Sequence, residues 1–245
     1  MCRPTHRNVC VVALFATVAA QACVHAANNV ARPRSVAPAA AEEPEAIDHG
    51  PSSYEGDVGG LSQEDVEEQL QALRPNLVEC VRSASVRLSW IGGKVSLRMR
   101  IDRTGAVRWA YLNDTTLGDR DTERCVLRVV QSRTWPLPLS GEGLAETSFD
   151  VEPSESPAAW PRYKTLAVAQ RASAATRKCR KGIAGEFRAT AYVGPTGEVL
   201  AAGVAPPNEK GEEASDCIAD ALRDLRFGNL VAAQSATAKV MFKIP

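Results

Sequence analysis

Histidine is almost absent from this chain of 245 residues, and all three histidines lie before residue 50. They are His6, His25 and His49. Histidine serves as general base or metal ligand only where a folded site holds its imidazole ring. The rest of the chain has no histidine, so the sequence excludes Ser-His, Cys-His and His-metal chemistry from it.

The chain also lacks an excess of charge of either sign. It has 29 Lys and Arg against 29 Asp and Glu, a formal net charge of zero. Binding to a polyanion through bulk charge is therefore excluded, and nucleic acid is not an expected partner. No CxxC pair is present, and Gly141-Glu142-Gly143 is only half of a dinucleotide-binding fingerprint. The sequence predicts neither a metal nor a cofactor.

Residues 1–22 have the features of a secretion signal. Arg3 and Arg7 are followed by an apolar stretch at 9–20, which is too short for a convincing membrane span. Small residues at positions 20 and 22 form a cleavage pattern. Export from the cytoplasm follows as the expectation.

Cys23 directly follows this cleavage pattern. The segment therefore resembles a bacterial lipoprotein signal, in which the cysteine is acylated and becomes the mature N-terminus. The alternative is a soluble export signal cut after Ala22 or after Ala26. The first case implies a membrane-anchored lipoprotein, and the second implies a soluble exported protein.

The region after the signal divides into four parts. Residues 23–60 are rich in alanine, proline and acidic residues and have almost nothing to bury, which predicts a disordered tether. Two folding units are predicted at 61–153 and 162–245, joined by a proline-containing linker at 154–161. Each unit has about 85 to 95 residues, enough for a modest core.

The two units are copies of one pattern, because adding 92 to several residue numbers of the first unit locates similar residues in the second. The equivalent landmarks are Gly93 and Gly185, Thr104-Gly105 and Thr196-Gly197, Val107 and Val199, Cys125 and Cys217, and Trp135 and Phe227.

Apolar periodicity predicts the same order of elements in both units. In the first unit we expect a helix after Ser62, which Pro75 should kink or split, strands at 95–102 and 107–112, a helix capped by Asp119 or Asp121, and a strand at 147–152. In the second unit we expect helices at 163–180 and 214–225 and strands at 186–193, 198–204 and 238–244. The fold class is α+β: each α-β-β-α-β unit places two helices on one face of a three-stranded antiparallel sheet and leaves the other face open.

Four cysteines lie outside the leader, two in each unit. In an oxidising compartment this parity suggests one disulfide per unit, Cys80 with Cys125 and Cys179 with Cys217. Buried free thiols are the alternative, because cysteine packs well as a small apolar group.

The order of elements, the glycine before the first strand and the Thr-Gly hairpin resemble the C-terminal domain of TonB-type energy transducers. The first unit is also similar to the AgmX/PglI C-terminal domain family of bacterial envelope proteins, which adds a cysteine pair. The matching stretches are 77–80, 93–95, 104–107, 116–119, 123–127 and 135–138. The second unit lacks the Thr-Leu-Gly-Asp step and resembles a diverged copy. The resemblance implies a non-catalytic, periplasmic protein-interaction module, and an association with TonB-like or gliding-type machinery is the corresponding expectation.

Two features are candidates for binding a partner. Arg98 and Arg100, with Arg108, form a basic row on the polar side of the first hairpin and could meet an acidic protein or an anionic glycan. An ordinary charged solvent face is the alternative interpretation. Trp90 lies in a loop that the second unit lacks, where it could contact a partner or pack over the domain's own core.

Three functions therefore remain open at the level of sequence. The leading hypothesis is an envelope protein that binds another protein, by adding a strand to an exposed sheet edge. The second is a protein that binds the cell wall or an anionic glycan through the arginine face. The third is an unrecognised hydrolase, which would require a pocket with convergent carboxylates.

Overall fold

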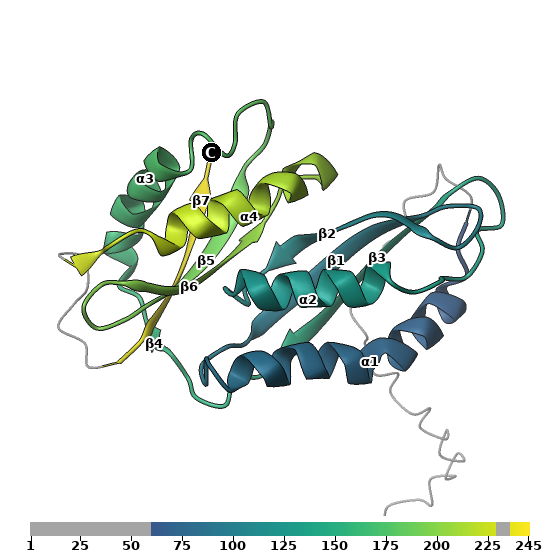
Figure 1. The fold of residues 1–245 in the computed structure, drawn as a ribbon, viewed down its shortest axis with the longest axis horizontal. Helices are drawn as coiled ribbons and strands as arrows, with labels where there is room; N and C mark the ends of the chain where they lie inside the picture. The colour runs from purple at the N-terminus through teal and green to yellow at the C-terminus, as the bar shows by residue number, and fades with distance from the viewer. Residues whose placement is uncertain (1–59, 229–235) are drawn as a thin grey trace, which may run out of the picture. The chain divides into compact units, whose positions relative to one another are not determined.

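The computed structural model describes residues 60–228 and 236–245. The predicted signal at 1–22, Cys23 and the tether as far as residue 59 lie outside the described residues. The described part is mixed α+β, with four α-helices and two sheets (Figure 1). This agrees with the predicted fold class.

The first unit (61–153) has the predicted order of elements. These are α1 (Gln63–Ser85), β1 (Gly93–Ile101), β2 (Val107–Thr115), α2 (Arg120–Gln131) and β3 (Gly143–Val151). The antiparallel sheet has the order β2-β1-β3, so β1 is central. Strand β3 begins four residues earlier than predicted, because Gly143 to Glu146 continue the pairing with β1.

The second unit (162–245) repeats this order. Its elements are η1 (Arg162–Lys164), α3 (Thr165–Ala175), β5 (Phe187–Val193), β6 (Val199–Ala205), α4 (Glu209–Arg223) and β7 (Ala238–Ile244). The order β6-β5-β7 matches β2-β1-β3. A short strand that we did not predict, β4 (Ala158–Ala159), comes from the linker and pairs in parallel with β7. The second sheet therefore has four strands instead of three.

Side-chain caps determine where three of the helices begin. Ser62 caps α1 by accepting from the Asp65 N–H, and Asp119, one of the two predicted candidates, caps α2. Asn208 caps α4, which therefore begins at Glu209, five residues before the predicted start. Glu209 and Glu212 lie in its first turn, where acidic groups stabilise a helix N-terminus.

Two helix predictions need correction in detail. We predicted that Pro75 would kink α1 or split it, and the split is contradicted, because α1 continues through Pro75 and Leu73 and Leu77 on either side of it are buried in the same core. Tertiary packing offsets the local cost of proline there. Helix α3 ends at Ala175 instead of residue 180. The Thr176 hydroxyl donates to the Ala172 carbonyl, a local bond that competes with continued helix.

The units pack together, although each has its own core. The core of the first lies between α1, α2 and the sheet, and the core of the second lies between α3, α4 and its sheet. Tyr192 and Ala201, from β5 and β6 of the second unit, belong to the core of the first. We call the sheet face turned away from a unit's own helices its outer face. The outer face of β5 and β6 is covered by the first unit.

This packing corrects the expectation that each sheet has an open face. On β5, Thr190 and Tyr192 alternate with the residues of the second core and are nevertheless buried. A Cβ at Gly118 would meet both of these side chains, and a Cβ at Gly203 would meet Glu123. The turn 116–119 and the start of α2 therefore lie on the second sheet. Small residues in β6, Ala201 and Gly203, allow this close approach.

Candidate interaction surfaces

The outer face of the first sheet carries the predicted arginine row. Arg98 lies opposite Tyr111 and Arg100 lies opposite Trp109 in the register of β1 and β2. Cross-strand partners share a sheet face, so the two arginines and the two aromatic rings lie together. The ring centroids of Trp109 and Tyr111 are 5.7 Å apart. Trp109 and Tyr111 were not among the residues predicted from the sequence to bind a partner.

Carboxylates of the same face neutralise much of the row. Arg98 pairs with Glu146, and Arg100 and Arg108 both pair with Glu142. Glu146 also accepts from the Asn113 amide at 2.6 Å. Three arginines and two glutamates leave a small excess of positive charge. The face therefore carries a network of ion pairs and hydrogen bonds beside aromatic rings. A polyanion gains little from such a face.

Arg108 takes part in this network because of a β-bulge. Arg100 pairs with Trp109 and Ile101 pairs with Val107, so Arg108 is the extra residue between two register positions. A bulge redirects the side chain that strict alternation would place on the opposite face. The placement of Arg108 beside Arg100 is confirmed, although simple period-two alternation does not explain it.

Strand β3 is an edge strand along its whole length. All nine of its residues pair with β1, and no described strand pairs with its other side. Ser148 and Asp150 are exposed, while Ala145 and Phe149 contact the core. An uncovered strand edge presents unpaired N–H and C=O groups, which is a template for another strand.

The equivalent strand β7 is partly covered by the chain itself. Ala158 and Ala159 of β4 pair with Ala238 and Lys239, and the Ala158 N–H donates to the Thr237 carbonyl at 2.8 Å. The β3-equivalent edge of the second unit thus accepts an extended segment. The two units differ in this respect, because nine residues of β3 have no such partner among the described residues.

Trp90 is placed within the contact between the units. Its ring lies 4.4 Å from that of Tyr192, centroid to centroid. The Tyr192 hydroxyl donates to the Gly92 carbonyl at 3.3 Å, and the Lys239 ammonium donates to the same carbonyl at 2.6 Å. Burial raises the pKa of Tyr192 to about 12 and lowers the pKa of Lys239 to about 8. Trp90 therefore packs against Tyr192 of its own chain. Tyr192 belongs to the second unit and was not predicted from the sequence to be part of this contact.

A second polar contact between the units is centred on Arg120. Its guanidinium donates to Glu212 at 2.5 Å and to Asp216 at 2.7 Å, both on α4. Only 5% of the Arg120 side chain is exposed. In sequence these residues look like the solvated polar faces of two helices, so periodicity alone did not reveal the network.

Glu123 lies deeper in the same contact and is fully buried. Its carboxyl accepts from the Val204 N–H at 3.0 Å and is 4.0 Å from Arg120. Burial raises the pKa of Glu123 to about 8, and the Val204 hydrogen bond and the Arg120 charge only partly offset this effect. A carboxyl that is easily protonated therefore lies in the contact between the units.

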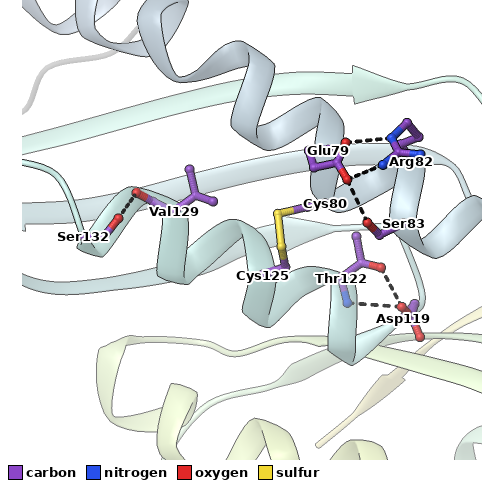
Figure 2. Close-up of a disulfide and its surroundings, with 9 residues drawn as sticks. All are labelled: Glu79, Cys80, Arg82, Ser83, Asp119, Thr122, Cys125, Val129 and Ser132. Atoms are coloured by element: carbon purple, nitrogen blue, oxygen red, sulfur yellow. Dashed lines mark hydrogen bonds and ion pairs between the residues drawn. A yellow bond between two sulfur atoms is a disulfide. The ribbon is translucent and has the colours of Figure 1, made fainter.

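Both predicted disulfides are present. Cys80 of α1 is bonded to Cys125 of α2, and Cys179 is bonded to Cys217 of α4. Figure 2 shows the first bond joining the two helices, with Cys125 six residues after the Asp119 cap, whose carboxylate accepts from Thr122. The first bond therefore links α1 to α2, and the second links the turn after α3 to α4. The alternative of free thiols is wrong.

The described residues contain no group of three or more His, Cys, Asp or Glu side chains placed to hold a metal ion. Among the same residues, no helix combines the length and the apolar character needed to cross a bilayer.

Comparison of the chain with protein-family models, with curated proteins and with solved structures returned no match.

Proposed function

We propose that this chain is a non-catalytic protein-interaction module of the bacterial cell envelope, and that its partner adds a strand to the free edge of β3. The observation that carries this proposal is the contrast between the two equivalent edges. Strand β7 receives β4 from its own linker, whereas the nine residues of β3 have no second partner among the described residues. The edge of β7 therefore pairs within the chain, whereas the equivalent edge of β3 can pair with a strand of another protein.

The location and family are part of this proposal. Two disulfides fit an exported protein, because such bonds persist in oxidising compartments. The repeated α-β-β-α-β order with a cysteine pair per unit is what the resemblance to TonB-type and AgmX/PglI C-terminal domains implies. We propose a periplasmic protein, anchored by a lipid on Cys23 if the lipoprotein signal is used, whose partner is another envelope protein.

Proline substitutions provide a direct test of strand addition. Neighbouring residues of a strand direct their N–H groups to opposite edges, so one of Thr147 and Ser148 donates toward β1 and the other toward the free edge. Proline removes the N–H in each case. Of Thr147→Pro and Ser148→Pro, we expect one to lower the melting temperature strongly and the other to melt close to the wild type.

The variant that melts normally is the informative one. Immobilised protein is incubated with envelope extract of the source cells, and the captured proteins are identified by mass spectrometry. We expect this proline variant to lose a partner that the alanine variant at the same position retains, since alanine keeps the N–H. Equal recovery of that partner by the two variants would contradict strand addition at β3.

The second candidate is binding to cell-wall glycan through the outer face of the first sheet. The observation that favours it is the half-buried ring of Trp109, packed near the buried Tyr111 and beside paired arginines and glutamates, which can offer a ring and fixed hydrogen-bonding groups to a sugar. Sedimentation with purified peptidoglycan tests it. Trp109→Ala should abolish co-sedimentation if this face binds glycan, and an absence of co-sedimentation by the wild type would eliminate the candidate.

A further inference from the structure

A groove of about 770 Å³ lies where the second unit meets the end of β2 of the first unit, beside the contact between the units. Helix α3, strands β5 and β7 and the end of β2 contribute to its walls. Its apolar lining residues are Leu166, Ala169, Ala174, Ala189, Met241 and Phe242. The volume lies within the range typical of pockets for small molecules.

Two large apolar side chains of this groove are solvent-exposed. Leu166 is 68% exposed and Met241 is 58% exposed. The accessible surface of the groove is mostly carbon, with few polar atoms. A peptide laid on such a wall would leave its own N–H and C=O groups without partners, which is costly. An alkyl chain has no such groups and gains free energy from burial there.

The charged residues of the lining are mainly cationic. Arg177, Arg188 and Lys243 come from three different segments, and Asp114 has the single side-chain carboxylate among the lining residues, which also include the C-terminal residue Pro245. Asp114 already lies 3.5 Å from Lys94 and 3.5 Å from Arg188, so it does not neutralise the others. The groove therefore complements a negative charge.

Arg177 is the cation best placed to bind an anion. Lys243 has a carboxylate partner, Glu186, at 2.7 Å, whereas no described carboxylate forms an ion pair with Arg177. The neighbouring Arg180 is a like charge. Its pKa is lowered, first by burial and then by the charge of Arg177. An anion beside Arg177 would relieve this repulsion.

We propose that this groove binds a single-chain anionic amphiphile such as a fatty acid. Its alkyl chain lies on the wall formed by Leu166 and Met241, and its head group lies beside Arg177. This site is separate from the β3 edge, so it does not depend on the proposed function. It gives the second unit a ligand of its own, while the first unit provides the edge for a protein partner.

Calorimetric titration of the full chain tests the ligand class. Dodecanoate is the probe, used below the concentration at which it forms micelles, with dodecyltrimethylammonium as the cationic match and butanoate as the short-chain match. We expect dodecanoate to bind, dodecyltrimethylammonium to bind at least about tenfold more weakly because its charge is repelled, and butanoate to give no measurable heat. Absence of dodecanoate binding, or equal binding of the cationic probe, overturns the proposal.

Substitutions at exposed positions test the location. Leu166→Asp and Met241→Asp should each weaken dodecanoate binding by about tenfold, because each removes apolar contact area and adds a negative charge. Leu139→Asp is the matched control. Leu139 is 86% exposed, lies outside the groove and should leave the affinity unchanged. If the control weakens binding as much as the groove variants do, the groove is not the site.

Discussion

The first and second units have the same order of elements and use it differently. In the first, the turn 116–119 and the start of α2 leave their own sheet and cover β5 and β6 of the second. In the second, the corresponding segment between β6 and α4 is Pro206-Pro207-Asn208, which caps α4 and covers no other sheet among the described residues. Part of the first unit thus covers one face of the second unit's sheet. The turn between β2 and α2 thus takes part in the contact between the units, and its counterpart in the second unit does not take part in the same way.

The largest effect that we predict tests what the units still share. Replacing both cysteines of either disulfide by alanine should lower the free energy of unfolding by about 4 kcal/mol in the chain-entropy model. The sequence separations of 45 and 38 residues are similar, so the two double variants should lose similar amounts. Urea denaturation measures both. If one double variant loses several times more than the other, the bonds are not equivalent.

Arg120 tests the contact between the units. Arg120→Ala leaves Glu212 and Asp216 without the buried cation that pairs with them, which should cost about 3 kcal/mol of unfolding free energy. Arg124→Ala is the matched control, because Arg124 lies 3.8 Å from the same Asp216 but is 53% exposed. The control should lose less than about 1 kcal/mol. Equal losses in urea denaturation would mean that the network does not join the units.

Gly203 tests the close approach of α2 to β6. A Cβ at this position would collide with the Glu123 carboxylate and approach the Asp119 nitrogen. Gly203→Ala should therefore destabilise the protein by about 2 kcal/mol. In Gly228→Ala the new carbon has only Thr196 O within reach, at 3.6 Å, and that variant should melt near the wild type. A Gly203→Ala protein with an unchanged melting temperature would show that the contact is looser than described.

Glu123 gives the most specific effect, a dependence of stability on pH. Its pKa is about 8 in the folded protein and near the ordinary 4.5 when unfolded, so the folded state binds the extra proton between these values. Stability is therefore highest at the acidic end of the range from about pH 5 to about pH 8, and it falls as the pH rises through the range.

No histidine lies in the described residues, and Lys239, whose pKa burial lowers to about 8, titrates only at the upper end of the range, so the slope at its acidic end can be assigned. The raised pKa of Glu212, which burial causes, acts in the same direction and leaves a residual slope. Glu123→Gln should flatten most of the dependence when unfolding is measured at several pH values. A slope that is unchanged in the variant would remove Glu123 as its source.

The sequence was sufficient to predict the features that depend on local pattern or on duplication. Alternation identified β1 and β2, the landmarks at an offset of 92 identified the second unit, and cysteine parity identified both disulfides. The contact between the units was not predictable in the same way. Arg120, Glu123 and Glu212 have the spacing of ordinary solvated helix faces, and their burial depends on a distant sheet.

In the candidate surfaces too, some features follow from local sequence and others depend on distant residues. Arg98 and Arg100 lie on the polar side of β1 as alternation requires, but their pairing with Glu142 and Glu146 depends on the register with β3. Trp90 could face a partner or the interior, and the answer came from Tyr192, which lies about one hundred residues later. Strand β4 has only two residues and no periodicity of its own. Short segments and contacts between units leave little signal in local sequence.

Hydrogen exchange on β3 and β7 is the most direct test of the proposed strand addition. In the free protein, the outward amides of β3 should exchange quickly, whereas Ala238 and Lys239 beside β4 should be protected. Addition of the captured envelope partner should protect alternate amides of residues 143–151 and leave β7 unchanged. Protection that appears on the outer face of the first sheet or in the second unit, with β3 still exchanging quickly, would contradict the account.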